Sequence, residues 1–332
     1  MKRKTGSGKS FLFLTLVLAI TLIPFSAWAA GYPQKPITLV APYGPGGASD
    51  LASRTLATVA HAYIGQPVLV VNKTGASGAM GSSYVNKAKP DGYTLLLARV
   101  GCNAVLPALN PNLPYEWDGF TMLGLLELNP FVFVVHSDSS IKSFQELVAA
   151  LKDKSKTLSY STSGPGTILH FGPQVLFDQI GLGKDAATML PYKGGGQAAA
   201  ALLGKHVDFM GINLAPVLSH IQAGTLRALA VTTKERYSAI PNVPTVRELG
   251  YPALETIIGW SGLFGPPNMD KEAVDKWVAA LQKIKKDKSW KTLTKKLGSI
   301  PYIIPPDETK AFVRKQYNTF HELAVKLDIL VK

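Results

Sequence analysis

The stretch that decides the fold is YGPGGASD, residues 43–50. It follows an apolar run at residues 37–41, ITLVA, and precedes a helical pattern of apolar residues over 51–63. The glycines allow a tight strand-to-helix turn that exposes backbone N–H groups at the start of the helix. Because a helix N-terminus carries unpaired donors and a partial positive charge, this turn can bind an anion without a cationic side chain.

A second turn of the same kind lies far downstream, at residues 161–167, STSGPGT. Ser163 and Thr167 add hydroxyl donors there, and Thr167 is also suited to cap the following helix. Glycine is common in such turns for geometry alone, and that alternative stays open for either turn taken singly. Two such turns together favour one anion held between two lobes.

The rest of the chain repeats short strand–helix units, with further strands expected at residues 68–71, 93–98, 157–161, 207–212 and 226–232. Residues 101–119 are rich in Pro and Asn, which favours a loop, and the pattern is helical from residue 270. We predict an α/β protein of two doubly wound lobes, the second inserted into the first, with a ligand cleft at the carboxyl ends of both sheets. Lobe 1 is expected to comprise residues 30–127 and 229–332, and lobe 2 residues 128–228.

The first 29 residues have the pattern of a cleaved export signal. A basic start is followed by an apolar run at residues 11–25 and by AWA at residues 27–29, which predicts cleavage after Ala29 and a periplasmic location. The alternative is an uncleaved anchor, but the apolar run is shorter than a membrane span. Since Cys102 is the only cysteine, the exported chain has no internal disulfide.

The chain is basic, with a formal net charge of +13, and four of its basic residues lie in the predicted signal. An exported basic protein is expected to meet small anions or an anionic membrane surface rather than nucleic acid. Seven lysines cluster in residues 283–296. A solvated helix face is the simplest interpretation of this cluster, and a docking patch for a membrane partner is the alternative.

No motif supports catalysis. The six histidines are scattered, no C-x-x-C occurs, and neither glycine turn completes G-x-G-x-x-G. We therefore expect no enzyme activity, no metal site and no cofactor.

Arg99 is the most suggestive single residue, because it follows the predicted strand at residues 93–98 and so falls at the edge of the cleft. A guanidinium there can bind a second carboxylate with two hydrogen bonds. The alternative is a surface arginine on a loop.

Several motifs occur in one order: YxPGGxxD from residue 43, PDGYTLL from 90, SGPGTxxH from 163, PYKGG from 191, GxLRALAVT from 224, PxVPTVxE from 241 and WxGL from 260. In these motifs, nearly the whole chain after the signal resembles the periplasmic solute receptors of tripartite tricarboxylate transporters, the Bug-type receptors. The resemblance implies two lobes that close on a small organic carboxylate and a membrane permease that receives it.

The resemblance also implies which residues contact the ligand. The first turn would contribute Gly46, Gly47 and Ala48, and the second Ser163, Gly164 and Thr167, largely through backbone donors and ordered waters. It carries over His170 as a residue at the side of the pocket. The rings of Tyr43, Tyr192 and Trp260 lie in the shared motifs, where they can line an aromatic site.

Three positions depart from the family pattern, and they leave the identity of the solute open. Arg99 opens a loop where small hydroxyl residues are common, and Asn213 stands where an acidic residue is frequent. Gly172-Pro173 falls inside the expected second helix, which proline should kink or shorten. Two alternatives remain besides the transport receptor, namely an exported two-lobed enzyme acting on a small acid and a ligand sensor that docks a membrane kinase. We expect a monomer.

Overall fold

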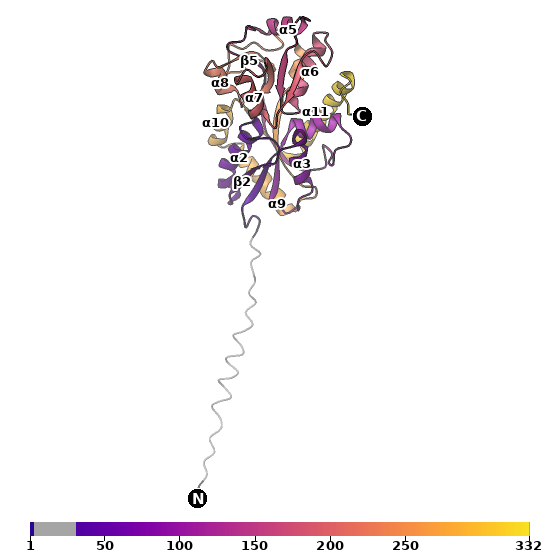
Figure 1. Cartoon of the computed structure of the whole chain (residues 1–332). Coiled ribbons are helices and arrows are strands. Elements are labelled where there is room, and N and C mark those ends of the chain that lie inside the picture. Colours follow the sequence, from indigo (N-terminus) through magenta and orange to yellow (C-terminus); the bar gives the residue numbers. More distant parts are fainter. Residues whose placement is uncertain (3–30, 332) are drawn as a thin grey trace.

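The structure, a computed structural model, describes residues 1–2 and 31–331. Two lobes are stacked end to end, each built around one mixed sheet with helices on its faces (Figure 1). The predicted α/β, two-lobed architecture is confirmed. The predicted signal sequence lies almost entirely outside the described residues.

Lobe 1 is built on a six-stranded sheet in the order β11-β4-β10-β3-β1-β2. Its strands are β1 (Ile37–Ala41), β2 (Val68–Asn72), β3 (Thr94–Arg99), β4 (Thr121–Asn129), β10 (Gly259–Gly265) and β11 (Ile300–Ile304). Strands β2, β1 and β3 are parallel, whereas β10 runs antiparallel to both β3 and β4. The parallel part therefore carries the strand-to-helix turns at one edge of the sheet.

Lobe 2 is built on a five-stranded sheet in the order β7-β6-β8-β5-β9. Its strands are β5 (Phe131–His136), β6 (Ser159–Thr162), β7 (Thr188–Pro191), β8 (Phe209–Asn213) and β9 (Leu226–Val231). Here β7, β6 and β8 are parallel, and β5 is antiparallel to β8 and β9. The two sheets thus share a plan, in which three parallel strands are joined to antiparallel ones.

Helices cover both sheets. In lobe 1 they are α2 (Ala48–Ile64), η1 (Ala76–Gly78), α3 (Ala79–Asn86), η2 (Gly101–Val105), α4 (Leu106–Leu109), α9 (Lys271–Ile284), α10 (Lys288–Lys296) and α11 (Pro306–Lys326). In lobe 2 the helices are α5 (Phe144–Lys152), α6 (Ile168–Gln179), α7 (Gly195–Leu203), α8 (Leu218–Gln222) and η3 (Pro252–Thr256). Ser143 caps α5 by accepting the Glu146 N–H, as its S-x-x-E pattern indicates.

The chain passes between the lobes at two neighbouring places. Pro130 joins β4 to β5, and the second passage leads into β10, whose first residue, Gly259, pairs with Asn129 of β4. Residues 232–258 stay with the second sheet, since Val246 donates to the Val231 carbonyl. The expected lobe boundaries, after residues 127 and 228, fall inside β4 and β9. Residues 229–258, which were expected in lobe 1, lie with the second sheet instead, and the chain returns to lobe 1 only at β10.

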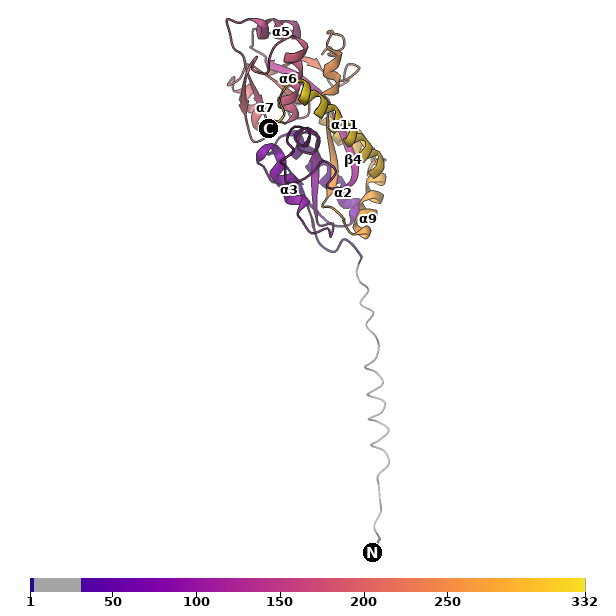
Figure 2. The ribbon, with the colours of Figure 1, turned by 90° about the vertical axis from the view of Figure 1, so that its right-hand side faces the viewer.

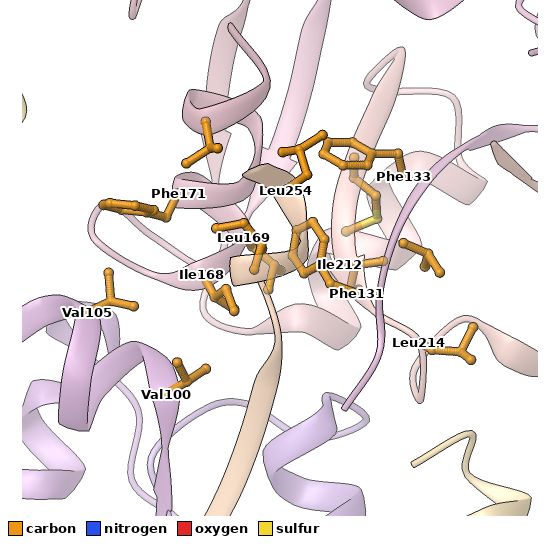
Figure 3. Packing of buried hydrophobic residues seen from close by; sticks show 14 of the residues in the cluster. Val100, Val105, Phe131, Phe133, Ile168, Leu169, Phe171, Ile212, Leu214 and Leu254 are labelled. Carbon is orange, nitrogen blue, oxygen red and sulfur yellow. The ribbon is translucent and has the colours of Figure 1, made fainter. Parts of the chain in front are cut away.

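The lobes also share buried contacts. Helix α11 runs from lobe 1 along the side of lobe 2 (Figure 2), where the Phe171 and Phe320 rings pack 5.3 Å apart. Between the sheets, Val100 and Val105 of lobe 1 face Ile168 and Leu169 of lobe 2 (Figure 3). One hydrophobic core therefore continues across the interface, and the lobes are in close contact in this structure.

One local expectation was wrong, and another was wrong in part. Residues 101–109 are helical rather than a loop, beginning with the π-helical turn η2. Pro173 does not shorten α6, which continues to Gln179. A side chain at Gly172 would meet the buried Phe131 ring at 2.5 Å, so this departure from the family pattern makes room for an aromatic residue of the core. Burial of the helix on both sides of Pro173 outweighs the lost backbone hydrogen bond.

Candidate ligand-binding site

The two glycine turns share part of their backbone geometry, although Gly164 has a positive φ of 115° and the equivalent Gly44 does not. Gly46 and Gly166 both adopt a left-handed conformation, with φ of 72° and 71°, which favours glycine. Each donates its N–H to a side chain four residues further on, Gly46 to Asp50 Oδ2 at 3.1 Å and Gly166 to His170 Nδ1 at 3.2 Å. The helix that follows each turn is thereby set at a fixed angle to its strand.

Both helices, and a third, begin without a side-chain cap. Gly47 precedes α2, Thr167 precedes α6 and Gly194 precedes α7, and none of the three provides a side-chain hydrogen bond to its helix. The Thr167 hydroxyl turns away and donates to the Gly164 carbonyl at 2.8 Å instead. The first N–H groups of these helices are left for another partner.

The three uncapped N-termini meet at one cavity between the lobes, with a volume of about 30 Å³. Its lining is Tyr43, Gly47, Ala48, Ser49, Arg99, Val100, Gly101, Ser163, Thr167, Ile168, Leu169, Gly195, Ile212, Asn213 and Pro216. This volume holds roughly two waters, so it accommodates a carboxylate group but not a whole diacid. The positive ends of three helix dipoles make the cavity attractive to an anion.

The cavity brings together seven of the residues predicted from sequence: Tyr43, Gly47, Ala48, Arg99, Ser163, Thr167 and Asn213. Five others, His170 among them, lie outside its lining. Gly46 and Gly164 shape the two turns from behind, and Tyr192 is half-buried against the core while its N–H donates to the Thr162 carbonyl. Trp260 is fully buried in the core of lobe 1.

His170 lines a separate cavity on lobe 2, beside Tyr160 and Gln174. Burial lowers the pKa of its imidazole from 6.5 to about 4. The ring is therefore neutral at physiological pH, and Nδ1 accepts the Gly166 N–H. In this arrangement His170 supports the second turn rather than facing the interlobe cavity.

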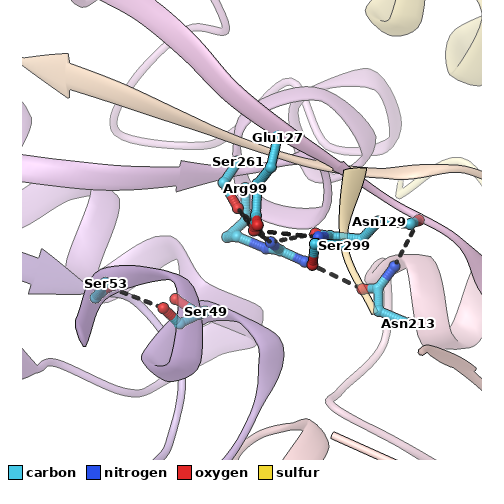
Figure 4. A network of polar contacts seen from close by, with 8 residues as sticks. All are labelled: Ser49, Ser53, Arg99, Glu127, Asn129, Asn213, Ser261 and Ser299. Atoms are coloured by element: carbon cyan, nitrogen blue, oxygen red, sulfur yellow. Dashed lines mark hydrogen bonds and ion pairs between the residues drawn. The ribbon is translucent and has the colours of Figure 1, made fainter. Parts of the chain in front are cut away.

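Arg99 is the last residue of β3 and is buried, with 3% of its surface exposed, so the interpretation as a loop arginine on the surface was wrong. Its Nη1 donates to Asn129 Oδ1 and Ser261 Oγ, and its Nη2 donates to Asn213 Oδ1 at 3.1 Å (Figure 4). The contact with Asn213 crosses between the lobes. Among the described residues, Arg99 Nε has no hydrogen-bond partner, although the side chain borders the cavity.

The charge of Arg99 is balanced from behind by Glu127, whose Oε1 lies 3.8 Å from Nη1. Burial lowers the pKa of Arg99, and the Glu127 carboxylate opposes that shift, so the guanidinium stays charged. Glu127 in turn accepts from Ser261 Oγ at 2.8 Å and Asn129 Nδ2 at 3.1 Å. This network fixes one side of the guanidinium and leaves the other side toward the cavity.

The first glycine turn packs on a third glycine turn from the other lobe. Gly44 donates its N–H to the Lys193 carbonyl at 3.2 Å. A Cβ added at Gly196 would lie 2.6 Å from the Pro45 oxygen, and one at Gly194 would lie 2.8 Å from the Gly44 nitrogen. Only glycine allows backbone to approach backbone this closely at both places.

The second glycine turn meets lobe 1 through a side chain. Ser77 Oγ donates to the Pro165 carbonyl at 2.6 Å, and the Tyr43 hydroxyl holds the Ser77 carbonyl at 2.8 Å. Burial raises the pKa of Tyr43 well above its ordinary value, so this hydroxyl remains a donor. The cavity is therefore closed by one interlobe contact at each glycine turn.

Sequence reasoning missed several lining residues, chiefly Ser49, Leu169, Gly195, Ile212 and Pro216. A usable signal existed for Gly195, because three glycines at residues 194–196 follow a strand and precede an alanine-rich helix, as in the other two turns. No such signal existed for Leu169 and Ile212, because the sequence pattern of an apolar residue that lines a cavity is the same as that of one buried in the core.

Residues 1–2 and 31–331 contain no group of three or more His, Cys, Asp or Glu side chains placed to hold a metal ion. In the same part of the chain, no helix combines the length and apolarity that crossing a membrane requires.

Fold and cavity define a two-lobed solute-binding protein of the periplasmic-binding type. Residues 52–329 match the model of the tripartite tricarboxylate transporter family receptor, and the chain belongs to this family. The family and its structural neighbours are solute-binding receptors rather than enzymes, which answers the enzyme alternative.

Three solved structures illustrate the similarity. The periplasmic binding protein BugD is 31% identical, with a TM-score of 0.85 over 91% of this chain and 100% of that one. MatC from Rhodopseudomonas palustris, solved with bound malate, is 26% identical, with a TM-score of 0.81 over 88% and 99% of the two chains. An R. palustris protein with adipate is 25% identical, with a TM-score of 0.84 over 90% and 98%.

Proposed function

We propose that the protein is an exported receptor that captures a small organic dicarboxylate between its lobes and delivers it to a tripartite tricarboxylate-type membrane permease. The observation that carries this proposal is the convergence of three uncapped helix N-termini and one buried arginine on a single interlobe cavity. Export, with cleavage after Ala29, and a monomeric state are part of the proposal.

The first carboxylate binds to the N–H groups at the starts of α2 and α6, beside Ala48 and Ile168. These donors are fixed by the two turns before the ligand arrives, so little ordering is needed on binding. Ser163 borders the same space and provides a further hydroxyl donor, whereas the Thr167 hydroxyl is engaged with the Gly164 carbonyl. A neutral amide in place of the carboxylate would lose the attraction of the helix dipoles.

A second carboxylate binds to the free side of Arg99. Glu127 holds the opposite side of the guanidinium, so Nε and one Nη2 hydrogen remain for the ligand. Support comes from MatC and the R. palustris adipate protein, whose ligands, malate and adipate, are both dicarboxylates. Arg99 and Asn213 are departures from the family pattern, so we expect these two residues to set the preferred length of the diacid.

The lobes must part to admit such a ligand, because the closed cavity holds only about 30 Å³. The two chain passages next to Asn129 and Gly259 lie side by side and form the natural hinge. The hydrogen bond between Arg99 and Asn213 breaks on opening, and a diacid that bridges both lobes would favour closure.

A thermal-shift screen of the purified protein tests the proposal, using aliphatic mono-, di- and tricarboxylates and their neutral amides. A ligand at a hundredfold excess over its dissociation constant stabilises the folded state by about 2.7 kcal/mol. We expect a dicarboxylate to raise the melting temperature and its diamide to have no effect. Equal shifts from acid and amide would contradict binding of a carboxylate at the helix N-termini.

Replacing Arg99 tests the second subsite. We expect Arg99→Ala to weaken a dicarboxylate about tenfold or more beyond any loss for its monocarboxylate analogue, because a charge-assisted pair contributes roughly 1.5–3 kcal/mol. Since the single variant leaves Glu127 buried without its cation, the double variant Arg99→Ala/Glu127→Gln serves as the control for stability. Calorimetric titration gives both affinities, and equal losses for the two ligands would defeat the assignment.

Uptake of the identified acid by cells lacking the gene tests delivery to the permease. We expect uptake to fall and to return when the gene is restored. Unchanged uptake together with a lost transcriptional response to the acid would favour the kinase-docking sensor instead.

A further inference from the structure

We propose that the lysine patch on α9 and α10 is a binding surface for anionic phospholipid headgroups, which holds the receptor close to the membrane. The patch consists of Lys283, Lys285, Lys286, Lys288, Lys291, Lys295 and Lys296. This inference concerns a different face from the ligand cavity and does not rest on the identity of the ligand. Figure 1 places α10 next to α2, on the side of lobe 1 away from α3.

All seven lysines are exposed, and none forms an ion pair within the described residues. Asp287 is the one acidic residue in residues 283–296, and its carboxylate is already engaged in hydrogen bonds to other residues. Its carboxylate caps α10 by accepting the Trp290 N–H at 2.8 Å, and it also accepts the Tyr63 hydroxyl. Elsewhere on the described surface lysines do have acidic partners, such as Lys271 with Asp275. The patch is therefore a surface of positive charge that no neighbouring carboxylate neutralises.

The composition of the patch favours a lipid surface over a protein partner. Stable protein interfaces have an apolar or aromatic centre and are depleted in lysine. In α9 and α10 the large aromatic side chains, Trp277 and Trp290, are fully buried, and neither helix contributes a large exposed hydrophobic side chain. Headgroups need only charge, and each lysine near an anionic surface strengthens binding about fivefold.

The patch lies on one rigid lobe. All seven lysines lie on α9, on α10 or in the short link between them in lobe 1, so their spacing does not depend on whether the lobes are open or closed. We therefore expect lipid binding to be independent of solute. Weak attraction to the membrane would keep the receptor near its permease in both states, which shortens the search for it.

Vesicle co-sedimentation tests the proposal, with protein purified from the periplasmic extract and vesicles of phosphatidylcholine with or without phosphatidylglycerol. The patch variant carries Gln at Lys285, Lys288, Lys291 and Lys295. The control variant carries Gln at Lys142, Lys152, Lys154 and Lys156, four exposed lysines of lobe 2, and so has the same net charge. Gln and Lys have similar helix propensities, so both variants should fold.

We expect binding only to the vesicles with phosphatidylglycerol, and stronger binding at low salt. Affinity should fall roughly several hundredfold in the patch variant, about fivefold for each of four lysines, but far less in the control. Equal losses in the two variants would show an effect of net charge alone and overturn the proposal, as would no binding at low salt. Unchanged vesicle binding with impaired uptake in the patch variant would assign the surface to a protein partner instead. The vesicle assay contains no carboxylate ligand, so a negative result there contradicts lipid binding without bearing on the carboxylate binding that the thermal-shift screen tests.

Discussion

The two turns that face the cavity share one sequence plan, and what differs is how each is held. GPGGASD at residues 44–50 and GPGTILH at residues 164–170 place Pro, a left-handed Gly and a helix N-terminus at the same positions. In both, the N–H of that Gly donates to the side chain four residues on. This part of the backbone geometry is thus repeated in the two lobes, and it brings two helix N-termini to one cavity.

The supporting side chains differ in charge. Burial raises the pKa of Asp50, but hydrogen bonds from Arg54 and the Gly46 N–H outweigh it and hold the pKa below its ordinary value. The first turn is therefore supported by an ion pair, with Arg54 Nη2 2.9 Å from Asp50. The second turn is supported by the neutral ring of His170.

The contacts made with the opposite lobe differ as well. The first turn meets Gly194–Gly196 backbone to backbone, where no side chain fits. The second meets the hydroxyl of Ser77, a residue in a left-handed conformation with φ of 56°. The first contact depends on the close fit of two backbone segments, whereas the second depends on a single hydrogen bond. Substitutions should therefore weaken the two contacts by different amounts.

The largest effect is expected from Gly196→Ala, which tests the shape-limited contact. Its Cβ would lie 2.6 Å from the Pro45 oxygen and 2.9 Å from the Gly46 carbon, and both are backbone atoms that cannot rotate away. We expect ligand affinity to fall roughly 5- to 150-fold, since forcing atoms into a packed contact costs about 1–3 kcal/mol. Titration calorimetry with the acid found in the screen measures the loss.

The matched control for that variant is Gly183→Ala, at an exposed glycine where an added Cβ meets nothing within 4 Å. Gly196 lies in the first turn of α7, where Ala is the better helix former, so the unfolding temperature of the Gly196 variant should not fall. Affinity close to that of the control would show that the lobes close without this contact.

Much of this arrangement was predictable because it is local. The strand at residues 37–41, the cap at Ser143 and the glycine turn before α2 follow from residues adjacent in the chain. The burial of Arg99 did not, because its partners Glu127, Asn213 and Ser261 come from three distant strands. A charged residue at the end of a strand is expected to be exposed to solvent, unless the residues that pair with it in the fold are known.

The contacts between the lobes could not be predicted from the sequence either. Pairing of the Gly44 turn with residues 194–196 depends on how two different sheets meet, and sequence periodicity carries no information about that. The error at Pro173 has the same origin. Local chemistry predicts a kinked or shortened helix, whereas burial of the residues on both sides of Pro173 keeps α6 running to Gln179.

A smaller effect is expected from a change of pH on the stability of the protein. Of the two turns, only the second should contribute to it. Burial lowers the pKa of His170 to about 4 in the folded protein, so the unfolded chain binds this proton more tightly. The stability gained by keeping the ring neutral is complete above the unfolded value of 6.5 and is lost as pH falls toward 4. We expect the free energy of unfolding to drop by about 2 kcal/mol from this group between pH 7 and pH 5.

Urea unfolding of the wild type and His170→Asn at pH 7, 6 and 5 measures this loss. Asn can still accept the Gly166 N–H but does not titrate, so the variant should lose less stability over the range. The lowered pKa of Asp50 places its own effect below the ordinary value of 3.8, outside this window. Parallel pH profiles for the two proteins would show that His170 is not the group responsible.

The smallest effect is expected from Ser77→Ala, which removes the one hydrogen bond between η1 and the second turn. A typical hydrogen bond contributes about 0.5–1.5 kcal/mol, so ligand affinity should fall roughly two- to tenfold. The left-handed backbone at residue 77 is as unfavourable for Ala as for Ser, so the variant isolates the hydroxyl. Ser289→Ala, at an exposed serine of α10, is the control. If Ser77→Ala reduced affinity as much as Gly196→Ala, the two contacts would be equivalent, and the contrast between a shape-limited turn and a hydrogen-bonded one would fail.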